Sequence, residues 1–341
     1  METSFHYEVY QNIIIELLDN HISCQLIIND LIEVDFVNNM TSFLNEVDEP
    51  RLSCILLSTV LHSSKTFSCL VSPYYLPYAE KISKIHIRTV YGLAKNEWNH
   101  AQWNEKYDCV LCYSHYTKDS LQDLTDAQIV GNPRFDDWHK KNFPVNMPGN
   151  FKLDPSKPTL LYAPTYGELS SLPHWAEKIS RLSKEYNIIT KLHHGTLYRS
   201  SEKNSLKLAK RFLKNITPSK ISIFSILKNV DYVISDNSGF IFDAINADKK
   251  IILLNWPGMN KLLVNNKSLS TTESAEQTVR EFLPVANDME DMRNYLADGY
   301  EWDKHKKHTH HIKYNYCDAF NDGSAGFRAA KVIMSKINES N

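Results

Sequence analysis

The chain has 341 residues, of which 42% are apolar and 23% charged, the balance of a globular protein large enough for two domains. With 38 basic and 40 acidic residues the net charge is -2, so the basic surplus typical of duplex binders is absent and we expect no nucleic-acid partner. Glycine occurs only 10 times, and neither GxGxxG nor GxxxxGK[ST] is present, which excludes the common dinucleotide fingerprint and the P-loop.

The N-terminus and the cysteines are typical of a protein of the reducing cytoplasm. Residues 1–4 lack a basic region and the first apolar run is broken by acidic residues, so we expect no signal peptide. The weakly charged stretch 52–62 is shorter than the roughly 20 residues of a membrane span. The six cysteines are scattered, which predicts free thiols. Cys109 and Cys112 form a lone CxxC inside an apolar run, and we expect them to be structural.

Apolar spacing in the first half predicts alternating helices and strands. Helices are expected over 7–18, 36–47 and 116–121, and strands over 24–28, 52–60, 107–113 and 127–130. Ser114 is expected to cap the helix that follows it. The segment Lys141–Lys157 holds three prolines and has little periodicity, so we predict an interdomain linker there.

The second half repeats the alternation more clearly. Strands are expected over 158–163, 187–192, 231–235 and 250–254, and helices over 173–186, 202–213, 224–227, 240–246 and 324–337. Repeated strand–helix units with nearly continuous apolar strands predict a parallel sheet covered on both faces. We therefore expect an α/β protein of two Rossmann-like domains, residues 1–145 and 146–320, facing each other across a cleft.

Polar residues follow three strands of the second half, where open α/β sheets bind their ligands. The segments are 162–166, 191–196 and 235–239, and they should converge at one edge of one sheet. His193 is a candidate general base, or a protonated partner for phosphate, because its pKa lies in the useful range. A hydrogen-bonded core histidine is the alternative, and His194 leaves open which ring acts.

The segment 236–243 predicts a phosphate site at a helix start. Ser238 would cap the helix and leave the amides of Gly239, Phe240 and Ile241 for an anion, aided by the helix dipole. Asp243, one turn further, could accept a ribose hydroxyl. The alternative is an ordinary cap with a solvated Asp243.

Five motifs together are similar to the pattern of the CDP-glycerol glycerophosphotransferases, the teichoic acid primases and polymerases with relatives in capsule synthesis. In chain order these are Gly131–Asp136, Leu161–Thr165, Lys191–His193, Ile234–Asp243 and Asp322–Arg328. Their order and spacing hold from about residue 84 to 335. Each motif alone is weakly specific, whereas five in order are fairly specific.

This resemblance implies a GT-B fold without a bound metal or other cofactor. It implies transfer of a polyol phosphate, such as glycerol phosphate, from a CDP-activated donor to an acceptor hydroxyl in teichoic acid or capsule synthesis, with release of CMP. The donor would lie on residues 146–320, and residues 321–341 would form a helix that crosses back to the first domain. Polysaccharide or lipid-linked acceptors imply a cytoplasmic protein at the inner face of the membrane.

The resemblance also assigns site residues. His193 and Asp236 would be catalytic. The donor and its nucleotide would be bound by Arg134, Thr165, His194, Ser238, Gly239 and Asp243. On the acceptor side the family carries His-Gly-x-x-x-Lys, and the matching stretch here supplies Tyr91, Gly92 and Lys95. Since a Tyr with a pKa near 10 is a poor base at neutral pH, His86 and His100 are the alternatives.

Two other functions stay open at this stage. A GT-B glycosyltransferase would use a nucleotide sugar for capsule or lipopolysaccharide, with His193 still binding diphosphate. A non-catalytic nucleotide-binding scaffold is favoured by the replacement at Tyr91 alone. The basic stretch Lys304–His311 is either a solvated face, a metal site or a contact for an anionic surface. Tyr74, with its aromatic neighbours, belongs either to the core or to a membrane contact.

Overall fold

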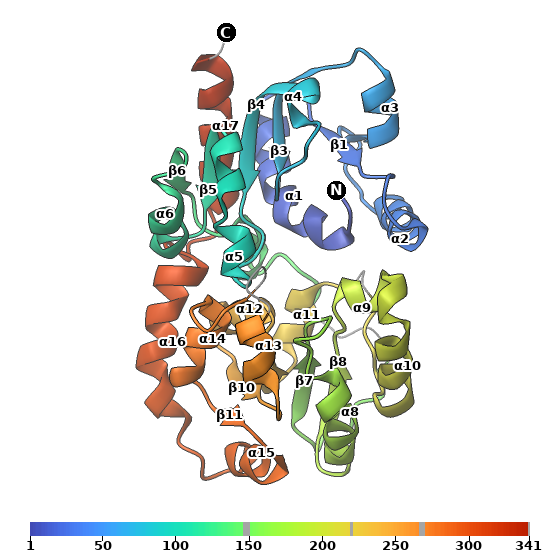
Figure 1. Ribbon diagram of the computed structural model, residues 1–341, viewed down its shortest axis with the longest axis vertical. Helices are drawn as coiled ribbons and strands as arrows, with labels where there is room; N and C mark the ends of the chain where they lie inside the picture. The colour runs from blue at the N-terminus through green and yellow to red at the C-terminus, as the bar shows by residue number, and fades with distance from the viewer. Residues whose placement is uncertain (146–150, 219–220, 266–269, 340–341) are drawn as a thin grey trace. The chain divides into compact units, whose positions relative to one another are not determined.

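The computed structural model describes residues 1–145, 151–218, 221–265 and 270–339, and the chain divides into two compact units (Figure 1). The first unit comprises Met1–Gly92, His100–Asn142 and the chain from Tyr314 onward. The second comprises Leu93–Asn99 and Phe143–Lys313. The boundary between the two units therefore lies after Asn142, whereas the composition predicted it after residue 145. The short segment Leu93–Asn99 belongs to the second unit, although the residues before and after it in the sequence belong to the first.

The first unit contains two parallel sheets. The larger has the order β3 (Phe67–Ser72), β4 (Ser83–Thr89), β5 (Cys109–Cys112) and β6 (Ala127–Ile129), and the smaller pairs β1 (Gln25–Ile28) with β2 (Ser53–Leu56). Its helices are α1 (Ser4–Asp19), α2 (Val34–Leu44), α3 (Leu57–His62), α4 (Ala79–Ile82), α6 (His115–Leu121), α7 (Asp136–Lys140) and α17 (Ala325–Glu339). Short 3-10 turns at Gln102–Lys106 (η1) and Pro133–Phe135 (η2) connect them.

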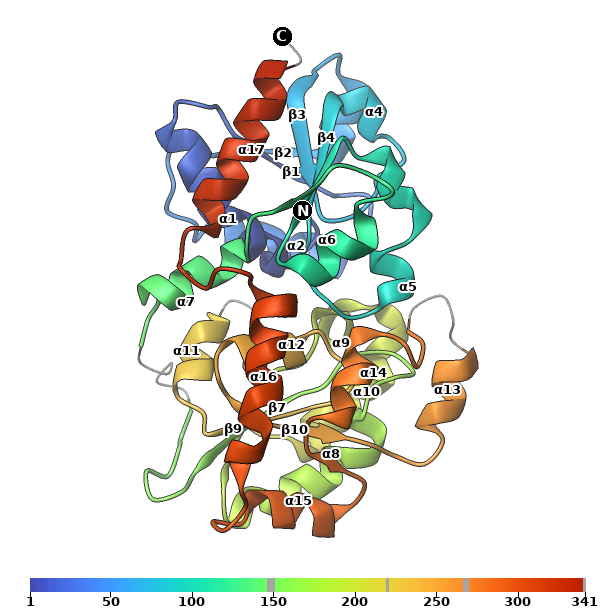
Figure 2. The same cartoon turned by 90° about the vertical axis from the view of Figure 1, so that its left-hand side faces the viewer.

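Helix α17, from the end of the chain, lies alongside α1, from its beginning (Figures 1 and 2). Ile13 of α1 and Ile333 of α17 share one core with the strand residues Ile87 and Leu111. The two helices approach closely because residue 326 is glycine: a Cβ there would stand 2.8 Å from the backbone of Asn12. The apolar faces of both helices therefore cover the same part of the larger sheet.

The second unit is built on one five-stranded parallel sheet of order β11-β10-β9-β7-β8. The strands are β7 (Thr159–Ala163), β8 (Asn187–Thr190), β9 (Tyr232–Ser235), β10 (Lys250–Leu254) and β11 (Val285–Ala286). The helices are α5 (Asn96–Asn99), α8 (Leu172–Arg181), α9 (His194–Tyr198), α10 (Lys203–Phe212), α11 (Ile223–Lys228), α12 (Phe240–Asn246), α13 (Met259–Asn265), α14 (Ala275–Thr278), α15 (Met289–Leu296) and α16 (Lys306–Ile312).

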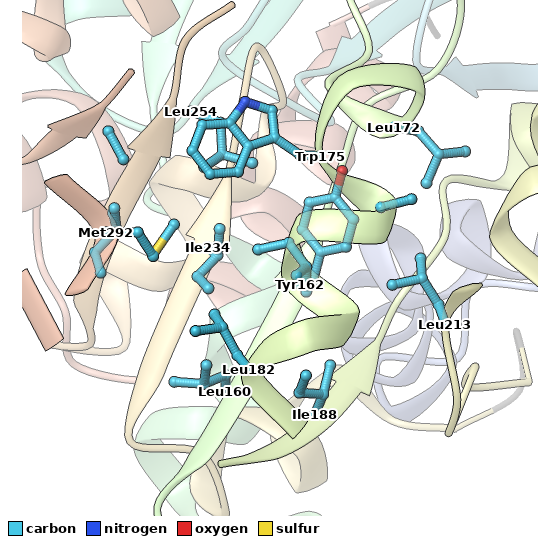
Figure 3. Packing of buried hydrophobic residues seen from close by; sticks show 14 of the residues in the cluster. Leu160, Tyr162, Leu172, Trp175, Leu182, Ile188, Leu213, Ile234, Leu254 and Met292 are labelled. Atoms are coloured by element: carbon cyan, nitrogen blue, oxygen red, sulfur yellow. The ribbon is translucent and has the colours of Figure 1, made fainter. Parts of the chain in front are cut away.

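Alternate residues of β7 and its neighbours pack under α8 to form the core of this unit (Figure 3). Leu160, Tyr162, Trp175 and Ile234 are fully buried there. The two polar atoms that the aromatic rings bring inside are both bonded: the Tyr162 hydroxyl lies 2.8 Å from Ser171 Oγ, and Trp175 Nε1 donates to a backbone carbonyl. The apolar run of β7 is thus explained by burial on both faces of the sheet.

Most of the predicted elements are confirmed, and those of the second half agree most closely. The strand expected over 52–60 is wrong from Leu57 onward, where α3 begins. Ser114 precedes α6 as predicted, but its hydroxyl donates to the carbonyls of Asn315 and Tyr316 and does not cap the helix. The central part of the predicted linker, 146–150 with Pro148 and Gly149, lies outside the described residues. Within the described ranges, no helix is both long and apolar enough to cross a membrane.

Candidate functional site

In the second unit, the order of strands reverses between β7 and β9, the point at which open α/β sheets form a ligand crevice. Asp236, directly after β9, joins the two loops there. Its carboxylate accepts the Thr165 N–H at 2.8 Å and the Ser171 N–H and Oγ–H at 2.7 Å each. The loop after β7 is therefore fixed on the loop after β9.

These contacts give Asp236 a positioning role. The residue is fully buried and both of its carboxylate oxygens are engaged by the protein. Burial raises its pKa, while the bonds from Ser171 and Thr165 and the nearby Arg280 guanidinium favour the ionised form. A carboxylate enclosed in this way joins the two loops, and both of its oxygens are occupied by protein donors.

The helix start after β9 offers fewer amides to an anion than expected. Helix α12 begins at Phe240, whose N–H donates to Ser238 Oγ at 3.2 Å, and the Ile241 N–H donates to the Ser238 carbonyl. The prediction that these two amides face a phosphate is therefore wrong. A Cβ built at Gly239 would lie 3.8 Å from the Cβ of Ala94, an ordinary van der Waals contact. Asp243 is half-buried one turn into α12.

His193 ends the loop after β8 and caps α9. Its Nδ1 accepts the Gly195 N–H at 2.9 Å, so the neutral ring carries its proton on Nε2. Burial lowers the pKa of His193 well below 6.5, and the adjacent His194 and three nearby cations lower it further. The same causes lower the pKa of His194 to about 3. At neutral pH the His193 side chain is thus a hydrogen-bond donor without charge.

Tyr166, in the loop after β7, contacts His193 and two of the basic side chains around it. Its ring stacks on the His193 ring with centroids 4.4 Å apart. The Lys95 ammonium lies 4.4 Å and the Arg199 guanidinium 5.3 Å from the centre of the Tyr166 ring. Residue 195 must be small here, because a Cβ would come within 2.7 Å of the Tyr166 ring. This group of side chains, Lys95, Tyr166, His193 and Arg199, is called the cationic cluster below.

Sequence reasoning placed Lys95 on the acceptor side, included Tyr166 only as part of a segment after a strand, and did not name Arg199. The structure brings Lys95 together with His193 in the second unit. Thr165, also in the second unit, is buried and is held through its backbone by Asp236. The sequence feature that indicates Tyr166 is its place directly after the Leu161–Thr165 motif.

The remaining predicted site residues belong to the first unit. Arg134 is buried, with its guanidinium 4.9 Å from the ring centre of Phe5. Tyr91 precedes Gly92 and packs against the His6 ring, with centroids 6.1 Å apart. His6, which sequence reasoning did not consider, is therefore an imidazole next to Tyr91.

The two histidines suggested as substitutes for the missing acceptor-side base have other surroundings. His86 Nε2 lies 2.8 Å from the Ser83 carbonyl at the beginning of β4, the end of the strand opposite to Tyr91. Burial lowers the pKa of His100 to about 4.

A cavity of about 500 Å³ lies inside the first unit. Apolar side chains of α1, β1 and β3 line most of it, and Glu2, His6 and Tyr74 add polar groups. The Tyr74 hydroxyl donates to the Glu2 carboxylate, and the Tyr74 ring also packs on Tyr91. Tyr74 is therefore half-buried and bonded inside the unit.

Two of the five motifs fasten α17 to the first unit. Asp136 accepts the N–H groups of Ala325 at 2.9 Å and Gly326 at 2.7 Å, at the start of α17. Arg328 donates from Nε to the Val130 carbonyl at 2.8 Å and holds Asp322 with both terminal nitrogens. The family pattern in these motifs therefore describes how the end of the chain is attached.

The cysteine pair and the histidine-rich stretch show no metal chemistry. Cys109 and Cys112 are free and buried in β5, and burial raises the pKa of each thiol to about 12. In the basic stretch, His308 stacks on Phe282 and Lys306 pairs with Asp303. Among the described residues no group of His, Cys, Asp and Glu is arranged to hold a metal ion.

Parallel sheets with covered faces, a strand-order reversal and a cationic cluster at the carboxyl edge are the features of the nucleotide-binding α/β class. Within that class, residues 94–335 match the model of the CDP-glycerol:poly(glycerophosphate) glycerophosphotransferases. The chain belongs to this family, as the five motifs predicted, and is an enzyme of the glycerophosphotransferase type.

Solved structures similar to this one share its fold at low sequence identity. The wall teichoic acid polymerase TagF, in a variant soaked with CDPG, is 13% identical with a TM-score of 0.60, over 99% of this chain and 94% of that one. A UDP-N-acetylglucosamine 2-epimerase is 10% identical with a TM-score of 0.54, over 99% and 94% of the two chains. MnaA of S. aureus with UDP is 12% identical with a TM-score of 0.55, over 98% and 95%.

These likenesses confirm the predicted fold class, α/β with parallel sheets of the GT-B type. Among curated protein sequences, none matches the chain.

Proposed function

We propose that this chain transfers glycerol phosphate from CDP-glycerol to a hydroxyl of a poly(glycerophosphate) acceptor, with release of CMP. The observation that carries the proposal is the family match over residues 94–335, which includes the whole cationic cluster. The donor would lie at the carboxyl edge of β7, β8 and β9, with its diphosphate toward His193. Asp243 would lie near the ribose and Ser238 near the phosphates.

In the reaction, the acceptor oxygen forms a bond to the phosphorus that bears glycerol. The bond from that phosphorus to the bridging oxygen breaks, and CMP leaves with the electron pair while the hydroxyl loses its proton. Catalysis of phosphoryl transfer consists mainly of positioning and charge stabilisation. His193 would donate from Nε2 to an oxygen that gains charge, and Lys95 and Arg199 would add positive potential.

The test is CMP release from CDP-glycerol by the intact chain in the presence of a poly(glycerophosphate) acceptor. Turnover that depends on both substrates, and elongation of the acceptor by mass spectrometry, would support the proposal. UDP-sugar turnover in place of CDP-glycerol turnover would assign a glycosyltransferase. Binding of one of these nucleotides in calorimetry without turnover of either donor would favour the non-catalytic nucleotide-binding scaffold.

We further propose that the acceptor is presented at an anionic membrane surface, with the enzyme at its cytoplasmic face. The support is the exposed side chains of Lys304, Lys306 and Lys307 in and beside α16. Sedimentation with phosphatidylglycerol vesicles, compared with phosphatidylcholine vesicles, tests this. Lys304→Glu together with Lys307→Glu should abolish the preference for the anionic vesicles and leave CMP release with a short soluble acceptor unchanged.

A further inference from the structure

Lys95 has a backbone conformation that residues with a Cβ rarely adopt. Its φ is +64°, in the left-handed region that a residue with a Cβ seldom occupies. A residue held in such a conformation persists only where its surroundings fix it, and such residues concentrate at functional sites. The Lys95 carbonyl then accepts the N–H of Trp98 and of Asn99, so α5 starts directly after it.

The group that fixes Lys95 is the Glu276 carboxylate. Both of its oxygens lie 3.2 Å from the Lys95 backbone nitrogen, which donates to them, and Ser270 Oγ donates to Oε1 at 2.5 Å. Glu276 is fully buried, and burial raises its pKa, while the bonds from Ser270 and Lys95 favour the ionised form. A second bond supports the same junction: Ala275, next to Glu276, donates its N–H to Asn96 Oδ1 at 3.4 Å.

The Lys95 side chain extends from this fixed backbone to the cationic cluster. Its ammonium lies over Tyr166, the same ring that stacks on His193, and Arg199 approaches that ring as well. The charged side chains that lower the pKa of His193 are those of Lys95, Lys191 and Arg199, and all three are basic. Several basic side chains beside a neutral imidazole complement an anionic ligand, because the anion brings the opposite charge.

We propose that Lys95 binds the diphosphate of the nucleotide donor and that Glu276 is the positioning residue that places it there. This inference rests on the proposed function and deepens it. The chain leaves the first unit after Gly92, delivers Lys95 to the second unit and returns at His100, so the diphosphate site is completed by a segment from the first half of the sequence. The ligand class is a nucleoside diphosphate, recognised by charge at its phosphates.

The experiment measures the affinity of CDP and of cytidine for the intact chain by calorimetry. Lys95→Met keeps an aliphatic stem on Tyr166 and removes the charge; it should weaken CDP by about tenfold and cytidine by less than about twofold. Lys210→Met, on the exposed face of α10, is the matched control and should change neither. Glu276→Gln should weaken CDP by about three- to tenfold, since the amide cannot accept the Lys95 N–H with both atoms.

A double variant separates positioning from general structural support. If Glu276 acts through Lys95, Glu276→Gln should change CDP affinity by less than about twofold in the Lys95→Met background. An equal further loss in that background, or CDP affinity unchanged in Lys95→Met, would overturn the proposal. Should Glu276→Gln fail to fold, the Lys95→Met comparison alone decides, because its side chain is half-buried and tolerates replacement.

The same data separate this proposal from the proposed function. A wild-type chain that binds UDP or GDP in place of CDP contradicts the CDP-glycerol assignment, and the Lys95 comparison is then made with that nucleotide. A chain that prefers cytidine compounds but shows equal losses for CDP and cytidine in Lys95→Met contradicts the Lys95 role alone. A chain that binds no nucleoside diphosphate contradicts both.

Discussion

In the second unit, the loops after β7 and β8 gather Tyr166, His193 and Arg199 into one charged group, whereas in the first unit the residues after β6 attach α17 to the sheet. His193 and the residues that attach α17 belong to the same family pattern. The first set places cations beside a neutral imidazole, and the second pairs Arg328 with Asp322 and Asp136 with the amides at the start of α17. A motif shared by a family can therefore describe either the chemistry of a site or the attachment of an element.

The contrast predicts that variants in the two regions will differ in kind. Changes in the cationic cluster should reduce activity and leave the free energy of unfolding nearly unchanged. Changes at Asp136, Gly326 or Arg328 should lower the free energy of unfolding, with activity following only through the amount of folded protein. Four experiments test this, and the largest effect is expected for the first.

His193→Ala should lower kcat by about 10²- to 10³-fold, the usual cost of removing one donor to a developing charge. The His193 side chain caps α9 by accepting the Gly195 N–H, so the melting temperature should fall by a few degrees at most. CMP release and thermal unfolding are measured on the same preparation. Turnover unchanged by His193→Ala would remove the role assigned to this residue.

Gly326→Ala should lower the free energy of unfolding by about 3 kcal/mol, at the upper end of the cost of overpacking. The added Cβ would meet backbone atoms of Asn12 at 2.8 Å, and backbone cannot move aside as a flexible side chain can. Urea denaturation measures the change, and CDP affinity of the folded protein is the control. A stability equal to that of wild type would show that α1 and α17 are not packed as closely as described.

Asp136→Asn should be more harmful at acid pH than at neutral pH. Burial raises the pKa of Asp136 to about 6, so its contribution to stability is full below the unfolded value near 3.8 and declines as pH rises through about 6. Because asparagine does not titrate, the stability difference between wild type and variant should be about 2 kcal/mol larger near pH 4.5 than near pH 7.5. Denaturation at both pH values measures it. A difference that grows with pH would contradict the assigned shift.

Much of the fold followed from local patterns. The strands β7, β9 and β10 were predicted because each is a short apolar run, and α12 and β10 have the expected bounds. Strand β4 was not predicted, because Lys84, His86 and Arg88 interrupt its apolar residues. Arg88 is nevertheless fully buried in the sheet, where it donates to the Pro73 carbonyl and to Asn104 Oδ1. Partners so distant in sequence leave no periodic signal.

The site was predicted less completely than the fold, for the same reason. His193 was identified because it directly follows a strand, and its surroundings agree with a ligand site. Asp236 also follows a strand, but only the structure shows that Ser171 and Thr165 occupy its carboxylate. Lys95 was assigned to the acceptor side because the resemblance places the motif that contains it there, whereas Glu276 holds it in the second unit.

The smallest expected effect is the acid sensitivity of the second unit, which should have the opposite sign to that of Asp136. Burial and nearby cations lower the pKa of His194 to about 3, so below the unfolded value near 6.5 the unfolded chain binds a proton that the folded chain does not. Stability from this residue is therefore full above about pH 6.5 and is lost as pH falls.

His194→Gln removes that titration and should reduce the loss of stability between about pH 7.5 and 5.5 by about 1 kcal/mol. The measurement is the free energy of unfolding from urea denaturation at both pH values. Asp136→Asn, measured in the same way, should remove a pH dependence of the opposite sign. CDP, which brings negative charge to the cluster, should reduce the acid sensitivity of the wild type by favouring protonated imidazole. If CDP leaves the pH dependence of the free energy of unfolding unchanged, its phosphates do not lie beside His194. The contrast between a charged ligand site in the second unit and the attachment of α17 in the first then loses its main support.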